Sequence, residues 1–151
     1  MGEMNAPQKI LISSAQKAIR VPRKRLAELV EFVARSEGVR VGQVDLAIVA
    51  APEITGVNRR FLGHAGATDV ISFDLSDKDI PGLCAQLVVC GDVAVEQAKA
   101  RGLKARDELM LYVIHGLLHL MGYEDTSIRG GARMHAREEE LLREFLKNRK
   151  A

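Results

Sequence analysis

Hydrophobic patterning divides the chain into short strands and amphipathic helices. Continuous runs of β-branched and other apolar residues predict strands, and apolar residues three and four positions apart predict helices. Pro22 begins the first helix, where a missing N–H costs nothing, and Gly38 ends it. The expected strands cover residues 9–13, 44–50, 70–73 and 87–90, and the expected helices cover residues 22–38, 52–61, 93–99, 108–121 and the chain beyond residue 131.

The order of these elements predicts an α+β fold. Strand, helix, strand, helix, strand and strand are followed by three helices, an order typical of a mixed four-stranded sheet covered by helices. With 151 residues, of which 47% are apolar and 28% charged, the chain fits one globular domain over residues 1–151. A domain of this length needs no disulfide framework, and its composition disfavours disorder.

Composition and charge describe the cellular setting better than the function. The two cysteines, Cys84 and Cys90, lie in an apolar stretch and are expected to be buried thiols. No apolar run reaches the roughly 18 residues that span a membrane, and residues 1–7 lack the pattern of a signal peptide. We therefore expect a cytoplasmic protein with no membrane partner. Its net charge of +2 is weak evidence about other partners.

Two histidines in an apolar helix are the strongest chemical signal. Residues 109–121 are apolar almost all round, which predicts a buried helix. His115 and His119 are four positions apart and therefore share one face, with Cβ atoms about 5–6 Å apart. Burying an imidazole is costly unless it finds a partner, and two imidazoles so placed can bind one metal ion. Two core histidines satisfied by hydrogen bonds are the alternative interpretation.

A carboxylate after this helix completes a possible ligand set. Gly122 ends the helix and turns the chain back, so Asp125 can supply a third ligand beside His115 and His119. Three protein ligands leave a fourth position for water, as in catalytic zinc sites. Metalloproteases with paired helix histidines use a Glu directly after the first His as general base, whereas Gly116 has no side chain here. A peptidase of that type is therefore disfavoured.

The same segment resembles a known bacterial family. Residues 115–125, HGLLHLMGYED, are similar to the signature His-Gly-x-Leu-His-Leu-x-Gly-Tyr-Asp-His of the YbeY family. Residues 58–63 and 68–73 resemble the family's Asn-x-x-Tyr-Arg-Gly and Pro-Thr-Asp-Val-Leu-Ser-Phe segments. Further matching positions are Gly91, Asp92, Met134 and Glu138. The resemblance extends, in order, over residues 40–145.

The resemblance implies a metal-dependent endoribonuclease that cleaves single-stranded RNA. Members of the family are implicated in the maturation of ribosomal RNA, chiefly the 16S 3′ end, and in ribosome quality control. The implied cofactor is one Zn²⁺ per chain, or another divalent metal such as Ni²⁺, in the helical C-terminal half. The implied partners are single-stranded rRNA and a ribosome or ribosomal protein. Few aromatic residues and no Trp argue against a platform for stacking several bases.

The implied metal ligands are His115, His119 and Asp125, and His115 is also the first catalytic candidate. A metal held there would polarise a phosphoryl oxygen and lower the pKa of its bound water. The family's third ligand is His where this chain has Asp125. A carboxylate oxygen is an acceptable zinc ligand and shifts the preference of the site towards harder metals.

The phosphate-binding group is the second departure from the family. The family's Arg is Leu62 here, so Arg59 is the first candidate for the catalytic and substrate-binding arginine, and Arg60 is the second candidate for substrate binding. Ser72 lies on one face of a strand and is expected to bond either the substrate or a neighbouring backbone group. Asp92 is expected to orient a metal-ligating imidazole through its second ring nitrogen.

Two other histidines receive surface interpretations, each with an alternative. His64 follows the Leu62 segment and is expected in an exposed loop, with a compensating polar role as the alternative. His135, on the last helix, is expected at the surface, with a reserve metal ligand as the alternative. Neither belongs to the predicted ligand set.

Hypotheses from different classes remain open. The leading one is a metal-dependent endoribonuclease acting in rRNA maturation. The runner-up, which the Leu62 departure supports, is a metal-stabilised ribosome-assembly or RNA-binding factor with weak or no nuclease activity. A metal-dependent hydrolase of another ester is the third. Replacing His115 or His119 with Ala separates them, because only an enzyme loses cleavage while keeping its fold and its RNA binding.

Overall fold

A mixed sheet of four strands forms the centre of the protein, in the part of the chain that its computed structural model describes, residues 9–148. The strands are β1 (Lys9–Ala15), β2 (Val41–Val49), β3 (Val70–Asp74) and β4 (Leu83–Cys90). Their order in the sheet is β1-β2-β4-β3. The pairs β1–β2 and β2–β4 are parallel, whereas β3 is antiparallel to β4 at the edge. The α+β fold class predicted from the sequence is confirmed.

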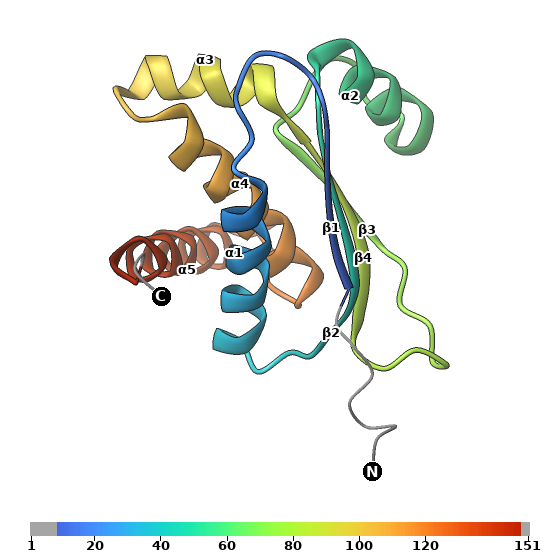
Figure 1. The fold of residues 1–151 in the computed structure, drawn as a ribbon. Helices are drawn as coiled ribbons and strands as arrows, with labels where there is room; N and C mark the ends of the chain where they lie inside the picture. Colours follow the sequence, from blue (N-terminus) through green and yellow to red (C-terminus); the bar gives the residue numbers. More distant parts are fainter. Residues whose placement is uncertain (1–8, 149–151) are drawn as a thin grey trace.

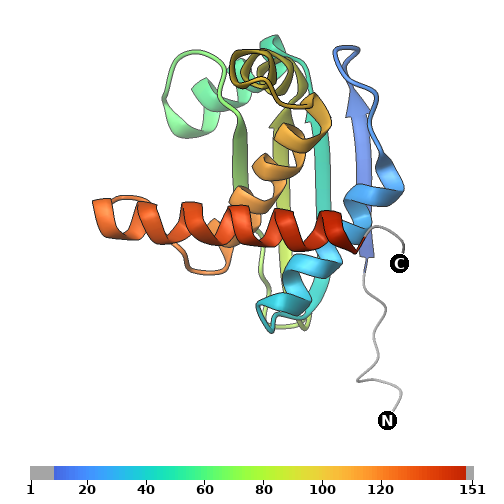
Figure 2. The same cartoon turned by 90° about the vertical axis from the view of Figure 1, so that its left-hand side faces the viewer.

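Helices cover both faces of this sheet. They are α1 (Arg23–Ser36), α2 (Ala51–Val57), the π-helical turn η2 (Asn58–Leu62), α3 (Gly91–Arg101), α4 (Ala105–Leu120) and α5 (Ile128–Lys147). Figure 1 shows α1, α4 and α5 on one side of the sheet and α2 on the other. In Figure 2, which faces the first of these layers, α5 crosses in front of α4 and the sheet. No helix in residues 9–148 combines the length and the apolar character needed to cross a membrane.

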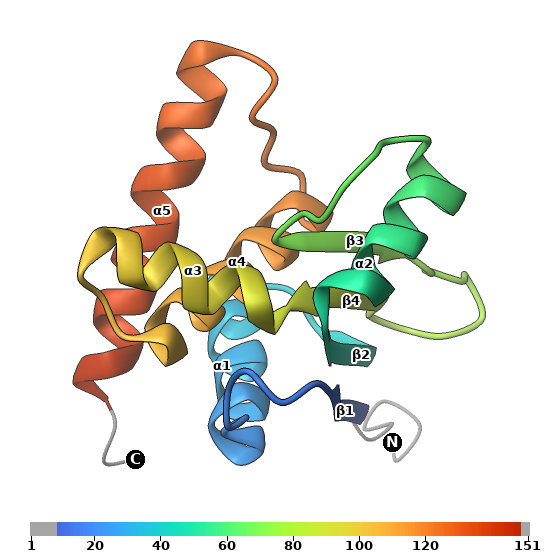
Figure 3. The same cartoon turned by 90° about the horizontal axis from the view of Figure 1, so that it is seen from above.

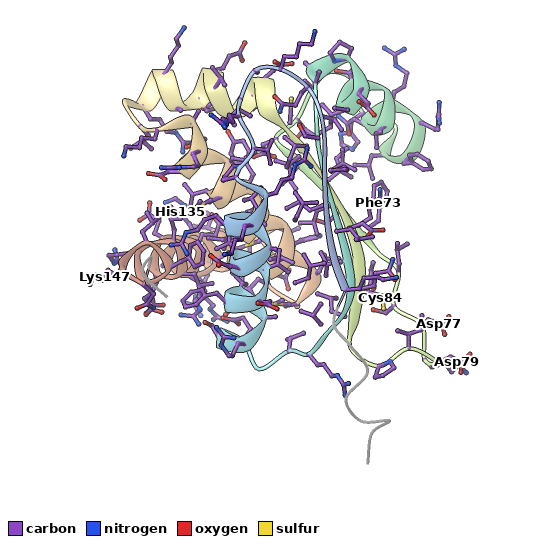
Figure 4. All side chains as sticks on the ribbon, in the orientation of Figure 1. Phe73, Asp77, Asp79, Cys84, His135 and Lys147 are labelled. Carbon is purple, nitrogen blue, oxygen red and sulfur yellow. The ribbon has the colours of Figure 1, made fainter. Side chains whose placement is uncertain are left out.

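Two apolar cores hold these layers together. The larger lies between the sheet and the layer of α1, α4 and α5. Its fully buried members include Leu26, Leu29, Leu46, Ile48, Leu109, Ile114 and Leu117. The smaller joins α2 to the opposite face through Ile54, Ile71 and Val88. Figure 4 shows Phe73 on that second face, away from α1, α4 and α5.

Several element boundaries differ from the sequence-based expectation, including the starts of β4, α3 and α5. β4 begins at Leu83 rather than residue 87, because Cys84 and Ala85 pair with β2. α3 begins directly at Gly91, without the expected break. α5 begins at Ile128, where the Ser127 hydroxyl accepts a hydrogen bond from the Gly130 N–H at 2.9 Å. Cys84 and Cys90 are both buried and free, as predicted.

A glycine sets the distance between α4 and the sheet. A Cβ placed at Gly116 would lie 2.5 Å from Leu87 Cδ2 and 2.9 Å from Ser72 Oγ, closer than real atoms approach. The Ser72 hydroxyl donates a hydrogen bond to the Gly116 carbonyl at 3.2 Å. The position that carries the general base in metalloproteases is therefore a packing contact in this protein, and it seats the histidine helix directly on β3 and β4.

Candidate metal centre

The three predicted ligands, His115, His119 and Asp125, line one cavity of about 230 Å³. The other lining residues are Leu62, Val70, Ile71 and Ser72. They come from the end of η2 and from β3. The structure thus brings together three segments that carry the family resemblance, although they are far apart in the sequence.

The end of α4 places Asp125 near the two histidines. Gly122 has a φ of +105°, a backbone conformation that glycine adopts without steric cost. Its N–H donates to the His119 carbonyl at 3.2 Å. The next N–H, from Tyr123, donates to the Leu118 carbonyl at 3.0 Å. This tight helix end returns the chain beside the last turn of α4, as the sequence predicted.

A buried carboxylate fixes the orientation of His115. Nδ1 of this imidazole is hydrogen-bonded to Oε2 of Glu138, which α5 contributes. Nε2 faces the cavity and lies 3.8 Å from Oδ2 of Asp125. The hydrogen bond with Glu138 raises the pKa of His115 above its usual value, although burial of the ring opposes the shift. Such a carboxylate–imidazole pair is the usual support of a metal-binding histidine.

The three predicted ligands suit a metal ion by the type of their donor atoms more than by the positions of those atoms. Two imidazoles and a carboxylate are typical zinc donors, and the supported His115 offers Nε2 to the cavity. Within residues 9–148, however, no group of three His, Cys, Asp or Glu side chains converges closely enough to hold a metal ion. His119 and Asp125 are exposed, so little packing opposes a change of rotamer in either. The residues therefore fit a metal by chemistry and by shared cavity.

The predicted phosphate-binding arginines lie outside this cavity wall. Arg59 and Arg60 are exposed on η2, and neither lines the cavity. The Arg60 guanidinium lies 5.9 Å from the centre of the Phe61 ring. Leu62, from the same turn, is the residue that lines the cavity. The position where the family has an arginine thus faces the candidate site as an apolar side chain.

The carboxylate that orients an imidazole is Glu138 and not Asp92, which corrects the sequence-based prediction. Oδ2 of Asp92 accepts a hydrogen bond from the Ala51 N–H at 2.7 Å and so stabilises the start of α2. Asp92 follows β4 at the start of α3, so its side chain belongs to that end of the sheet. A signal for Glu138 existed in the sequence, because it lies on the buried stripe of α5 between Met134 and Leu141.

The remaining polar candidates, Ser72, His64 and His135, either make local contacts or are exposed. Ser72 lines the cavity but bonds the Gly116 backbone, the second of its two predicted alternatives. His64 lies in an exposed loop, as expected. His135 is exposed on α5, with Nε2 3.2 Å from Oε2 of Glu139, and this agrees with its surface interpretation. Figure 4 shows it beside α5, on the side toward α3 and α4.

The fold and the cavity define an α+β protein whose paired-histidine helix packs directly on a mixed sheet. A sequence model of the family described as "Endoribonuclease YbeY" matches residues 11–146. The chain belongs to the YbeY family.

Individual relatives agree with this assignment. The protein named Endoribonuclease YbeY from Bacillus licheniformis is 32% identical over 150 residues, covering 90% of this chain and 95% of the relative. Its namesake from Syntrophus aciditrophicus is 32% identical over 139 residues, covering 88% and 87%. A solution structure of a Thermotoga maritima protein has a TM-score of 0.64 at 27% identity and covers 93% of this chain and 91% of that one. The predicted resemblance is confirmed.

Proposed function

We propose that this protein is a metal-dependent endoribonuclease that cleaves single-stranded RNA during ribosomal RNA maturation. The observation that carries the proposal is the shared cavity of His115, His119 and Asp125 in a chain of the YbeY family. The relatives carry the name endoribonuclease, which supports an RNA phosphodiester as the bond cleaved. The 16S 3′ end is the proposed target, with the ribosome as partner, quality control as a linked role and the cytoplasm as the setting.

Each residue around the cavity has a separate role in the proposed reaction. His115, His119 and Asp125 would hold one Zn²⁺ or another divalent ion such as Ni²⁺, which when bound polarises a phosphoryl oxygen and lowers the pKa of a water. Glu138 keeps Nε2 of His115 directed into the cavity. Leu62 provides an apolar wall on the η2 side of the cavity.

Stabilisation of the phosphate is assigned to exposed arginines. A phosphoryl transition state carries additional negative charge, which a guanidinium neutralises best. Arg59, and secondarily Arg60, lie on the turn that ends at Leu62, and their exposed side chains can approach a bound phosphate from outside the cavity. Ser72 contributes by holding α4 on the sheet rather than by touching RNA in the free protein.

One observation favours a second candidate function. Leu62 removes the arginine that the family places at the cavity wall, so the chain lacks a cation among the residues that line this cavity within residues 9–148, apart from the histidines. A metal-stabilised RNA-binding or ribosome-assembly factor with weak nuclease activity needs no such group. The two functions differ in whether the metal-loaded protein cleaves RNA.

The test combines metal content with RNA cleavage. Untagged protein purified without chelator is analysed for metal, and a single-stranded RNA is incubated with it. We expect about one zinc or nickel per chain and cleavage of the RNA. His119→Ala should lose both while it keeps its fold and its RNA binding, and His64→Ala, at an exposed loop histidine, should lose neither. Folded protein that takes up no metal, even after incubation with zinc, would contradict the proposal.

Replacement of the unusual ligand tests the metal set directly. Asp125→His introduces the imidazole found in the family, and we expect this variant to retain zinc and to bind it more tightly, since imidazole is a strong donor for zinc. Zinc affinity is measured by competition with a chromogenic chelator. A lower affinity than in the unmodified chain would remove Asp125 from the ligand set.

A further inference from the structure

A cavity of about 570 Å³ opens where the loop between β1 and α1 meets the beginning of α4. Figure 3 shows this loop beside the first turn of α4. The lining residues are Ile19, Arg20, Val21 and Pro22 from the loop, with Lys104 and Arg106 from the start of α4. None of these residues lines the candidate metal centre, and none has a role in the reaction proposed above.

The charged side chains of this cavity are all cations. Arg20, Lys104 and Arg106 are exposed, and within residues 9–148 the lining contains no carboxylate. None of the three forms an ion pair with another residue in that range. Asp107 belongs to the first turn of α4 but does not line the cavity. Like charges around a cavity with apolar walls reinforce one another's field, so this cavity attracts anions.

The sequence of both segments extends this positive surface. Residues 16–25 contain five Lys or Arg, residues 99–106 contain four, and neither segment contains Asp or Glu. Two of these nine cations form ion pairs with glutamates, and the other seven form none within the described chain, residues 9–148. Because the net charge of the whole chain is only +2, these two short segments hold a strong local excess of positive charge.

Hydrogen bonds of Gln16 hold the loop in place. Its Nε2 donates to Ser14 Oγ at 2.9 Å and to the Ile19 carbonyl at 2.8 Å, and its Oε1 accepts from the Ile19 N–H at 3.0 Å. Gly91, at the start of α3, leaves room for this amide, since a Cβ there would lie 2.6 Å from Gln16 Oε1. Arg20 follows Ile19 directly, so its backbone is ordered before any ligand binds, which lowers the entropic cost of binding.

The anion that fits this cavity best is the sugar–phosphate backbone of RNA. A guanidinium binds a phosphate through two parallel hydrogen bonds, and a nucleic-acid backbone supplies several phosphates in a row for cations that come from two segments. Within residues 9–148 the lining has no aromatic side chain on which a base could stack. The contact is therefore with phosphates, and it does not depend on the base sequence.

We propose that this cavity, here called the basic cleft (Arg20, Lys104 and Arg106), binds the phosphate backbone of RNA at a distance from the bond that is cleaved. Lys104 directly precedes α4, and His115 lies eleven positions further along the chain. At 1.5 Å per residue, the separation is about 16 Å along the helix axis. The identity of the anion as RNA rests on the proposed function, whereas the attraction of anions rests on the basic cleft alone.

The salt dependence of binding tests the basic cleft without cleavage. The probe is a fluorescein-labelled DNA dodecamer of thymidines, which carries the same phosphates as RNA and is not the substrate of an endoribonuclease. Fluorescence anisotropy gives Kd at several salt concentrations. Each neutralised phosphate contributes about −0.7 to the slope of log affinity against log salt for a single strand. The triple variant Arg20→Gln, Lys104→Gln, Arg106→Gln should therefore make the slope shallower by about 2 and weaken binding about tenfold or more at low salt.

A control variant removes the same charge from another part of the surface. Arg35→Gln, Arg143→Gln, Lys147→Gln alters three exposed cations of α1 and α5 outside the basic cleft. It should leave the slope and Kd nearly unchanged. Equal losses in the two triple variants would show a general effect of net charge and overturn the proposal. Each single substitution in the basic cleft should make the slope shallower by about 0.7, so the test holds even if the triple variant fails to fold.

An acidic protein segment is the competing ligand for the same cations. A labelled peptide of twelve glutamates is titrated under the same conditions as the DNA. We expect the peptide to bind about tenfold more weakly, because the release of counterions condensed on a nucleic acid adds to its affinity. Equal or tighter binding of the peptide, lost in the triple variant of the basic cleft, would overturn the assignment to RNA.

RNA cleavage separates failure of the basic cleft from failure of the proposed function. Metal-loaded protein is given a dodecamer of uridines or a dinucleotide of uridine, whose single phosphate cannot occupy the metal centre and the basic cleft together. The triple variant should raise KM for the dodecamer about tenfold with kcat unchanged, and leave both constants unchanged for the dinucleotide. An unchanged KM for the dodecamer would overturn the basic cleft and leave the nuclease standing. An altered salt slope without any cleavage by the unmodified protein would support the basic cleft and contradict the nuclease.

Discussion

Leu62 is the residue at which this chain departs most consequentially from its family. It lines the candidate metal cavity with an exposed fraction of 49%, so a longer side chain can be accommodated there. Leu62→Arg should raise kcat for RNA cleavage about tenfold, because it returns a guanidinium to the proposed phosphate site. Steady-state kinetics on a single-stranded RNA provides the measurement.

The control for this substitution carries the same charge elsewhere. Leu75 is also exposed but does not line the cavity, so Leu75→Arg should leave kcat unchanged. Equal increases in both variants would indicate a general effect of positive charge on RNA binding. An unchanged rate in Leu62→Arg would mean that Arg59 already supplies the guanidinium.

Glu138 contacts the candidate metal centre through His115 and is therefore a positioning residue. Glu138→Gln removes the charge that holds Nδ1 and should weaken zinc binding about 10- to 100-fold. Competition with a chromogenic chelator measures this without reference to activity. Glu139→Gln, which alters the exposed neighbouring carboxylate, serves as the control. Unchanged zinc affinity in folded Glu138→Gln would show that His115 needs no support from α5.

At the scale of single elements, local patterns predicted most of the fold. Each expected strand and helix is present, because its apolar spacing is complete within its own segment. The start of β4 was missed since residues 83–86, although mostly apolar, contain no β-branched residue and become a strand through pairing with β2. Such pairing depends on residues about forty positions away in the sequence, which no local window contains.

The candidate site shows the same difference between features set by nearby residues and features set by distant ones. His115, His119 and Asp125 lie within one helix end, so their spacing alone predicted their common cavity. The partners of Glu138 and Asp92 are 23 and 41 positions distant. Their roles depend on how α5 and α2 pack against the sheet. The sequence therefore predicted which residues share the cavity but assigned the supporting carboxylate to the wrong residue.

The contact between α4 and the sheet can be tested at Gly116. Gly116→Ala places a methyl group against Leu87 and Ser72 and should lower the free energy of unfolding by about 1–3 kcal/mol. Denaturant unfolding provides the measurement. Gly56→Ala is the matched control in α2, where the added methyl group meets no atom within 4 Å and should stabilise the helix slightly. Equal effects of the two substitutions on the free energy of unfolding would show that α4 does not approach the sheet closely at Gly116.

At the scale of the whole molecule, one carboxylate ties together three parts of the chain around the site. Glu37, just after α1, accepts hydrogen bonds from the Tyr123 hydroxyl at 2.9 Å and from Nε of Arg137 at 2.8 Å. Tyr123 belongs to the segment that carries Asp125, and Arg137 precedes Glu138 on α5. These two bonds therefore fix the relative positions of a proposed ligand and of the carboxylate that supports His115.

Loss of this tie should affect both stability and metal binding. The Glu37 side chain is only 12% exposed, so Glu37→Gln leaves the Arg137 charge poorly compensated and should cost about 2 kcal/mol of unfolding free energy. Glu140 pairs with the same guanidinium at 2.7 Å but is 49% exposed, and Glu140→Gln should cost less than about 0.5 kcal/mol. Zinc affinity should fall in the first variant and not in the second, because only Glu37 holds the Asp125 segment against α5. A stability loss in Glu37→Gln with unchanged zinc affinity would show that the hydrogen bonds of Glu37 do not affect metal binding. The position of Asp125 would then depend on the end of α4 alone.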